Sequence, residues 1–212
     1  MTTTSSYPDR GSRGSGWTAV EKEELERAVR ERQAGFWLYL LSDALIFALL
    51  FATWAVMADR IATGPDTRSL LDLNKAFVET MLLLSSSFTF GLATLELRAD
   101  RVRNCLLWMA VTFLLGAAFL GFELTEFMGL IDQGAGPDVS GSLSSFFTLV
   151  GTHGLHVTAG LVWLAVSFIQ LLVIGNDIQL CARIERLGMF WHFLDIVWIG
   201  IFTFVYLWGA AA

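Results

Sequence analysis

The chain has 212 residues, of which 55% are hydrophobic and only 16% are charged, and its mean hydropathy is +0.59. Soluble domains carry about 25% charged residues, so this composition indicates an integral membrane protein. The net charge is -6, and because the sequence has no basic patch we expect no nucleic-acid partner.

The first 33 residues are polar and divide into two predicted segments. Residues 1–17 are rich in Ser, Thr and Gly, which predicts a disordered tail. Residues 18–33 begin with the capping-box pattern of Thr18 and Glu21 and continue with Glu and Arg four positions apart. This pattern predicts a short surface helix. We favour a solvated lead-in helix over one that lies on the membrane.

Residues 34–212 are predicted to form a single all-α membrane domain. A helix of about 20 apolar residues crosses a bilayer. Five apolar runs reach this length, so we expect a bundle of five transmembrane helices. They occupy residues 34–57, 75–97, 104–130, 142–174 and 188–208.

The distribution of Lys and Arg predicts the orientation of the bundle. With the N-terminus in the cytoplasm, eleven of the 14 Lys and Arg residues lie on the cytoplasmic side and three lie outside. Cytoplasmic loops carry an excess of these residues. We therefore expect a cytoplasmic N-terminus and, after five crossings, a periplasmic C-terminus.

The last span carries a histidine and a carboxylate within its apolar sequence. His192 and Asp195 are three positions apart and share a helix face, with Trp191 and Trp198 close by. A charge inside a membrane is costly unless it faces protein or water and has a partner. We therefore expect the other helices to provide neighbours for this pair.

Depth along the helices predicts two layers of buried polar residues. The first layer, in the cytoplasmic half, contains Asp43, His192 and Asp195. The second layer, in the periplasmic half, contains the remaining ionisable residues of the spans. These are Glu79, Glu123, Glu126, His153 and His156.

The second layer allows two interpretations. Three carboxylates and two histidines are the ligand types of a carboxylate-bridged di-metal centre. However, that centre uses repeated Glu-x-x-His motifs, whereas here Glu-x-x-Glu and His-x-x-His lie on different helices. We favour a structural hydrogen-bonded network, in which Glu123 or Glu126 contacts His153 or His156. We predict no metal ligand and no catalytic residue.

The first layer also allows two interpretations. Intramembrane carboxylates often conduct protons, but we favour contacts between helices, with Asp195 accepting from His192 or from a Trp N–H. Asp43 lies about 13 Å from the cytoplasmic end of its helix. We expect it to be mostly neutral at pH 7, with His192 as a candidate partner, and to tune proton uptake from a position near a lipid cleft.

Stretches in all five spans, together covering about residues 34–208, resemble subunit III of the haem–copper terminal oxidases. The match is closest to the five-helix form in bacterial cytochrome o (bo-type) ubiquinol oxidase. The stretches that carry it are Phe36–Asp43, Val78–Leu84, Gly121–Phe127, Gly151–Val157 and Phe190–Trp198.

The resemblance implies a non-catalytic subunit of an oxidoreductase complex in the bacterial inner membrane. This chain would hold no cofactor. Haem and copper would belong to subunit I, which reduces oxygen with electrons from ubiquinol and pumps protons. Subunits II and IV and bound phospholipid would be further partners. The chain would support assembly, lipid binding and sustained proton uptake.

The resemblance also bears on Asp43 and on the branch of the family. In the cytochrome c oxidase branch, a carbodiimide-reactive glutamate occupies the position that matches Asp43. That branch has two further N-terminal helices, so five spans favour the quinol oxidase branch. The alternatives are an accessory protein of a nitric-oxide reductase and an intramembrane di-metal enzyme.

Overall fold

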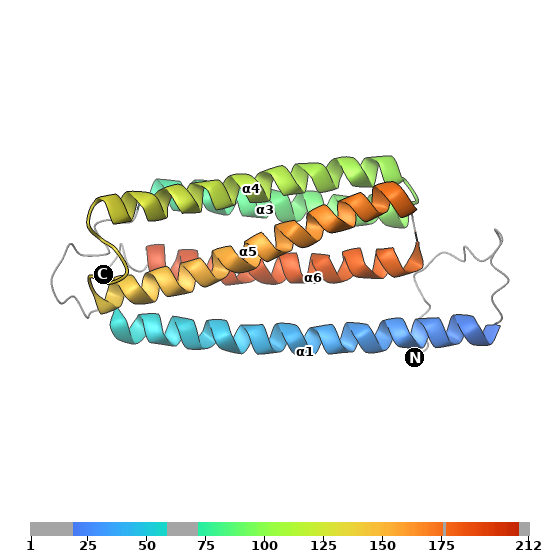
Figure 1. The fold of residues 1–212 in the computed structure, drawn as a ribbon, viewed down its shortest axis with the longest axis horizontal. Helices are drawn as coiled ribbons and strands as arrows, with labels where there is room; N and C mark the ends of the chain where they lie inside the picture. Colours follow the sequence, from blue (N-terminus) through green and yellow to red (C-terminus); the bar gives the residue numbers. More distant parts are fainter. Residues whose placement is uncertain (1–18, 59–71, 176, 208–212) are drawn as a thin grey trace.

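The computed structural model of the chain describes residues 19–58, 72–175 and 177–207 (Figure 1). These residues form helices and turns, with no strand among them. The expected tail and the capping residue Thr18 lie outside the described residues. The helices are α1 (Ala19–Met57), α3 (Leu73–Arg98), α4 (Val102–Asp132), α5 (Gly141–Ile174), α6 (Ile178–Ile201) and the π-helical turn η1 (Phe202–Leu207).

The predicted number of membrane spans is confirmed for the described part of the chain. Five helical segments are long and apolar enough to cross a bilayer. They are Arg30–Met57, Leu73–Arg98, Val102–Asp132, Gly141–Val173 and Gln179–Leu207.

Two predicted helix boundaries are wrong. The surface helix expected at 18–33 and the span expected at 34–57 form one continuous helix, α1. No proline interrupts this stretch, and the Arg27 guanidinium donates to Glu23 at 3.4 Å within it. The last helix begins at Ile178, ten residues before the expected start at 188. The apolar run marks the membrane span, but the helix continues past it into polar sequence.

Side-chain caps explain where three of the helices begin. Oδ1 of Asp72 accepts from the backbone N–H groups of Asn74 and Lys75 at the start of α3. Ser140 accepts from the N–H of Leu143 before α5, and Asp177 caps α6. Each cap satisfies backbone donors that have no partner inside the first helical turn.

The helices lie side by side with α6 near the middle of the bundle (Figure 1). Helix α1 packs on α5 and α6, while α3 and α4 pair on the opposite side. Because α6 contacts α1, α3 and α5, it carries the largest fully buried side chains, Trp191 and Trp198.

Two glycines form a slot for the indole ring of Trp191. A Cβ atom on Gly116 of α4 would lie 3.0 Å from this ring, and one on Gly160 of α5 would lie 3.1 Å from it. The ring also stacks on Phe90 of α3, with an interplanar angle of 11°. Trp191 therefore packs against three other helices at one level of the bundle.

Candidate functional site

Asp43 of α1 pairs with His156 of α5 inside the bundle. Asp43 is 6% exposed, and its Oδ2 lies 3.6 Å from Nε2 of His156. The other ring nitrogen, Nδ1, lies 2.7 Å from the carbonyl oxygen of Thr152. Since a carbonyl only accepts, Nδ1 carries a hydrogen. A single further proton, on the carboxyl or on Nε2, then makes the Asp43–His156 contact attractive.

The contact corrects two predictions. His156 joins the first layer instead of the second, and the partner of Asp43 is His156 instead of His192. Helix α5 has 34 residues and is about 51 Å long, which exceeds the membrane thickness. Counting from its end therefore misplaced His156, which lies close to the middle of the helix.

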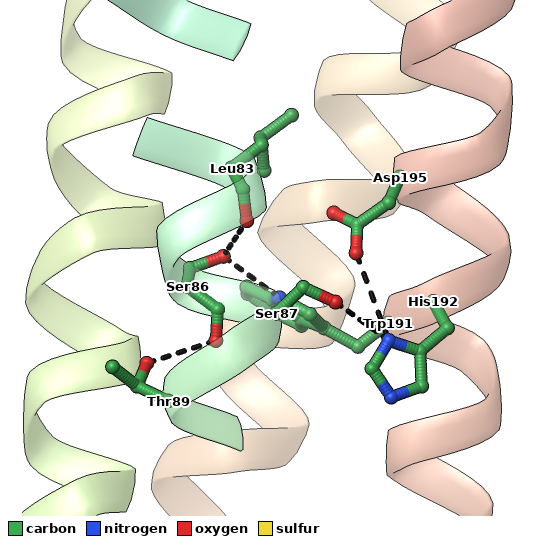
Figure 2. A network of polar contacts seen from close by, with 7 residues as sticks. All are labelled: Leu83, Ser86, Ser87, Thr89, Trp191, His192 and Asp195. Atoms are coloured by element: carbon green, nitrogen blue, oxygen red, sulfur yellow. Dashed lines mark hydrogen bonds and ion pairs between the residues drawn. The ribbon is translucent and has the colours of Figure 1, made fainter. Parts of the chain in front are cut away.

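His192 and Asp195 of α6 face α3, where Ser87 is their neighbour (Figure 2). Nδ1 of His192 lies 2.6 Å from Oγ of Ser87 and 3.7 Å from Oδ2 of Asp195. The expected proximity of His192 and Asp195 is present, but the short hydrogen bond of the ring goes to Ser87. Both polar partners use the same ring nitrogen. The arrangement therefore differs from a catalytic relay, in which the two nitrogens of the imidazole bind different groups.

The two buried tryptophans donate to hydroxyl groups of α3. Nε1 of Trp191 donates to Ser86 at 3.0 Å, and Nε1 of Trp198 donates to Thr80 at 3.1 Å. Each hydroxyl in turn donates to a carbonyl of its own helix, Ser86 to Leu83 and Thr80 to Ala76. Neither indole N–H donates to Asp195, contrary to one of the expected contacts.

Sequence reasoning missed Ser86, Ser87 and Thr80 as hydrogen-bonding partners. Ser86 and Thr80 are six residues apart on α3, and the tryptophans they accept from are seven apart on α6. Both spacings correspond to about two helical turns. The similar spacing of hydroxyl residues on one span and tryptophans on an antiparallel span was the signal in the sequence that could have predicted these hydrogen bonds.

Three glutamates of the second layer are buried between α3, α4 and the end of the last span. Glu79, Glu123 and Glu126 are 1%, 2% and 8% exposed. The hydroxyl of Tyr206 donates to Oε2 of Glu126 at 2.9 Å. Both oxygens of Glu79, Oε2 of Glu123 and Oε1 of Glu126 have no hydrogen-bond partner among the described residues. Such groups are costly in low dielectric as free anions, so the layer favours neutral carboxyl groups.

His153 is held by aromatic rings at the centre of the bundle. It is 0% exposed, and its ring centroid lies 5.4 Å from that of Trp198 and 5.9 Å from that of Phe119. Neither ring nitrogen has a hydrogen-bond partner in the described part of the chain. The predicted contact between a second-layer glutamate and a histidine is therefore wrong as a hydrogen bond. The carboxyl group of Glu123 instead lies against Gly154.

The geometry does not favour the di-metal interpretation. In the ranges that the structure describes, no three His, Cys, Asp or Glu side chains are placed to hold one metal ion. Ionisable residues instead make polar contacts between spans in pairs, such as Asp43 with His156, His192 with Ser87, and Glu126 with Tyr206. This pattern joins helices to one another.

Comparison with known proteins agrees with the resemblance seen in the motifs. Residues 24–210 match the family described as "Cytochrome c oxidase subunit III". The chain belongs to this family. It is 52% identical over 176 residues to cytochrome bo(3) ubiquinol oxidase subunit 3 of Pseudomonas aeruginosa, covering 83% of this chain and 84% of that protein. It is 43% identical over 175 residues to quinol oxidase subunit 3 of Bacillus subtilis, covering 82% and 86%.

The subunit III family also includes a less similar relative that is named as a cytochrome c oxidase subunit and not as a quinol oxidase subunit. Cytochrome c oxidase subunit 3 of Bacillus sp. (strain PS3) is 39% identical over 175 residues, covering 82% of this chain and 84% of that protein. The matches extend over most of both chains. The similarity is therefore not confined to one part of the chain.

Proposed function

We propose that this chain is subunit III of a proton-pumping haem–copper ubiquinol oxidase in the inner membrane of an aerobic bacterium. The 52% identity to a ubiquinol oxidase subunit 3, which extends over 83% of the chain, is the observation that carries the proposal. The names of the relatives support this function over a role beside a nitric-oxide reductase.

In this proposal, the chain supports the complex without taking part in electron transfer. Haem and copper reside in subunit I, and subunits II and IV complete the assembly. Ubiquinol is the electron donor of the complex. The buried pairs between helices suit a rigid support, because satisfied polar groups fix helix positions inside a membrane. Bound phospholipid fills clefts on the surface of the subunit.

We assign the N-terminus to the cytoplasm and the C-terminus to the periplasm. Two interhelical contacts support this orientation, since they gather the basic residues at one end of the bundle. Arg98 at the end of α3 contacts Glu185 of α6 at 3.1 Å. Arg183 of α6 donates to Gln170 near the end of α5 at 2.7 Å. Such an end fits the cytoplasmic side.

Purification through an affinity tag on this chain tests the proposal. In mild detergent the chain should bring down a haem-containing complex that consumes oxygen when ubiquinol is supplied. The control is a tagged, unrelated five-span protein from the same membranes. Recovery of the chain alone, or with a complex that reduces nitric oxide and not oxygen, would contradict the proposed function.

A further inference from the structure

His192 places a polar ring on the outer surface of a membrane span. Its side chain is 53% exposed, and its neighbour one turn further along α6, Ile196, is 69% exposed. His192 lies thirteen residues after Gln179, where the span begins, which is about 20 Å along the helix axis. This position is close to the middle of the span, far from the level of lipid headgroups.

Among the described residues, only one of the two ring nitrogens of His192 has a polar partner. Nδ1 contacts Ser87 and Asp195, as Figure 2 shows. Nε2 has no hydrogen-bond partner among the described residues, and it lies on the side of the ring away from Asp195 (Figure 2). Lipid tails offer no hydrogen bond at this depth, so a ring nitrogen facing them is unfavourable.

The surface beside His192 leaves room for another helix. One turn beyond Ser87 on α3, a Cβ atom on Gly91 would meet no atom within 4 Å. Small residues at the surface of a span let a second backbone approach closely. Phe88, which follows Ser87 in α3, and Ile196, one turn after His192 in α6, are each 69% exposed. We call the surface formed by Phe88, Gly91, His192 and Ile196 the His192 face.

We propose that the His192 face docks a transmembrane helix from another subunit of the complex, which offers a hydroxyl, amide or carboxyl group to Nε2 of His192. The inference rests on the proposed function, because it needs a complex with other membrane-spanning chains. A lipid tail supplies no partner for Nε2, whereas a helix of another subunit supplies both the polar group and the apolar contacts.

Site-specific photo-crosslinking in the intact complex tests this surface. The photoreactive residue p-benzoylphenylalanine replaces Phe88 in one variant and Ile196 in another. Leu155 of α5 is the control position, since it is also 69% exposed and lies next to His156, whose ring is 6.4 Å from that of Phe190 on α6. The control thus probes a similar depth on another helix.

Covalent adducts between this chain and a different subunit are expected from Phe88 and Ile196, and at much lower yield from Leu155. Adducts with lipid only, or with a second copy of this chain, would overturn the docking proposal. The haem content of the tagged complex is measured before irradiation. A tagged complex without haem would contradict the proposed function itself. A complex that contains haem but gives no adduct with another subunit would contradict only the docking proposal.

Substitution of His192 gives a second test. The direction of the change in retention of the chain in the complex shows whether His192 faces lipid or a helix of another subunit. Against lipid, His192→Leu should leave retention of the chain unchanged or improve it, because leucine is favoured there. Against a hydrogen-bonding helix, His192→Leu should raise the fraction of chain released during detergent washing by about three- to tenfold. Retention that is unchanged or improved would overturn the proposal.

Two further variants separate docking from the internal contact with Ser87. His192→Gln keeps a hydrogen-bonding group, so the released fraction should stay close to that of the native chain. Ser87→Ala removes the internal partner of Nδ1 and leaves Nε2, so release should rise less than with His192→Leu. If Ser87→Ala releases as much chain as His192→Leu, the ring acts only within this subunit and the proposal is wrong.

Discussion

At the scale of single residues, the Asp43–His156 pair is the clearest case of a buried carboxyl group with a partner on another helix. The hydrogen on Nδ1 of His156 is held by the carbonyl of Thr152, so Nε2 faces the carboxyl group of Asp43. Phe47 lies over the histidine ring at a centroid distance of 5.2 Å. The pair links α1 to α5, with the Asp43 side chain 8% exposed and that of His156 20% exposed.

We predict that Asp43→Asn retains most oxidase activity and most proton pumping. Asparagine has the size of aspartate, and its amide can donate to Nε2 of His156, so the contact survives without a titrating group. The measurement is oxygen uptake together with protons released per electron in vesicles that contain the purified complex. Loss of pumping in a fully assembled complex would place Asp43 on the proton route and contradict a tuning role.

His156→Leu should lower assembly or thermal stability more than turnover. The substitution leaves the carboxyl group of Asp43 buried without its partner, which costs about 1–3 kcal/mol. Complex yield and the melting temperature report the loss, and turnover is measured per haem. His156→Gln is the control, because its amide preserves a polar contact. Normal assembly with most of the turnover gone would indicate a chemical role instead.

At the scale of helices, large side chains of α6 and η1 donate hydrogen bonds to α3 and α4. Trp191 and Trp198 each reach a hydroxyl of α3, and Tyr206 reaches Glu126 of α4. Polar contacts between membrane helices contribute about 0.6 kcal/mol on average. Because this contribution is small, the position of α6 depends on the packing of the indole rings as well as on their hydrogen bonds.

We predict a measurable coupling between Trp198 and Thr80. Trp198→Phe and Thr80→Val each remove one side of the hydrogen bond, and the double variant closes a thermodynamic cycle. The coupling should be about 0.6–1.7 kcal/mol, measured by unfolding of the chain in detergent. A matched cycle of Trp198→Phe with Thr125→Val, an exposed threonine on α4 that bonds to its own helix, should show none. Equal values in both cycles would contradict the assignment.

Filling the indole slot should destabilise the bundle. Gly116→Val puts a side chain where Trp191 already lies at 3.0 Å from the added Cβ, and overpacking costs about 1–3 kcal/mol. Gly121→Val on the same helix is the control, since nothing lies within 4 Å of its added Cβ. The melting temperature of the chain in detergent should fall clearly for the first variant and change little for the second. Equal falls would contradict the packing account.

At the scale of the whole molecule, the connections at the two ends of the bundle differ in their content of Lys and Arg. Arg98, Arg101 and Arg183 gather at the end formed by the α3–α4 and α5–α6 connections, where each contacts a neighbouring polar group. The α4–α5 connection at the other end has no Lys or Arg in residues 131–141. Such asymmetry is what orients a bundle during insertion.

Cysteine labelling of intact cells and of inverted vesicles should reveal this orientation. Arg103→Cys at the basic end should react with a membrane-impermeant maleimide only in inverted vesicles, and Asp138→Cys only in intact cells. Both positions are exposed, and both changes are made in a Cys181→Ser background because Cys181 is partly accessible. The opposite pattern would reverse the proposed topology.

The membrane class, the five spans and the residues that need partners are all readable from the amino-acid sequence. Apolar runs of sufficient length and the few charges inside them are local properties, readable without contacts. The sequence also allowed the subunit III resemblance, since the motifs around Asp43, Glu123, His153 and His192 are short and continuous.

Which of these residues contact one another follows from the packing of the helices and is not readable from the sequence. The relative axial position and rotation of the packed helices determine these contacts. They set the pairing of Asp43 with His156, the hydroxyl partners of the two tryptophans, and the lack of a hydrogen-bond partner for His153 among the described residues. A one-residue change in that arrangement rotates a side chain by about 100°, and helix ends alone do not determine it. Depth counting failed for His156 because α5 is longer than the membrane is thick.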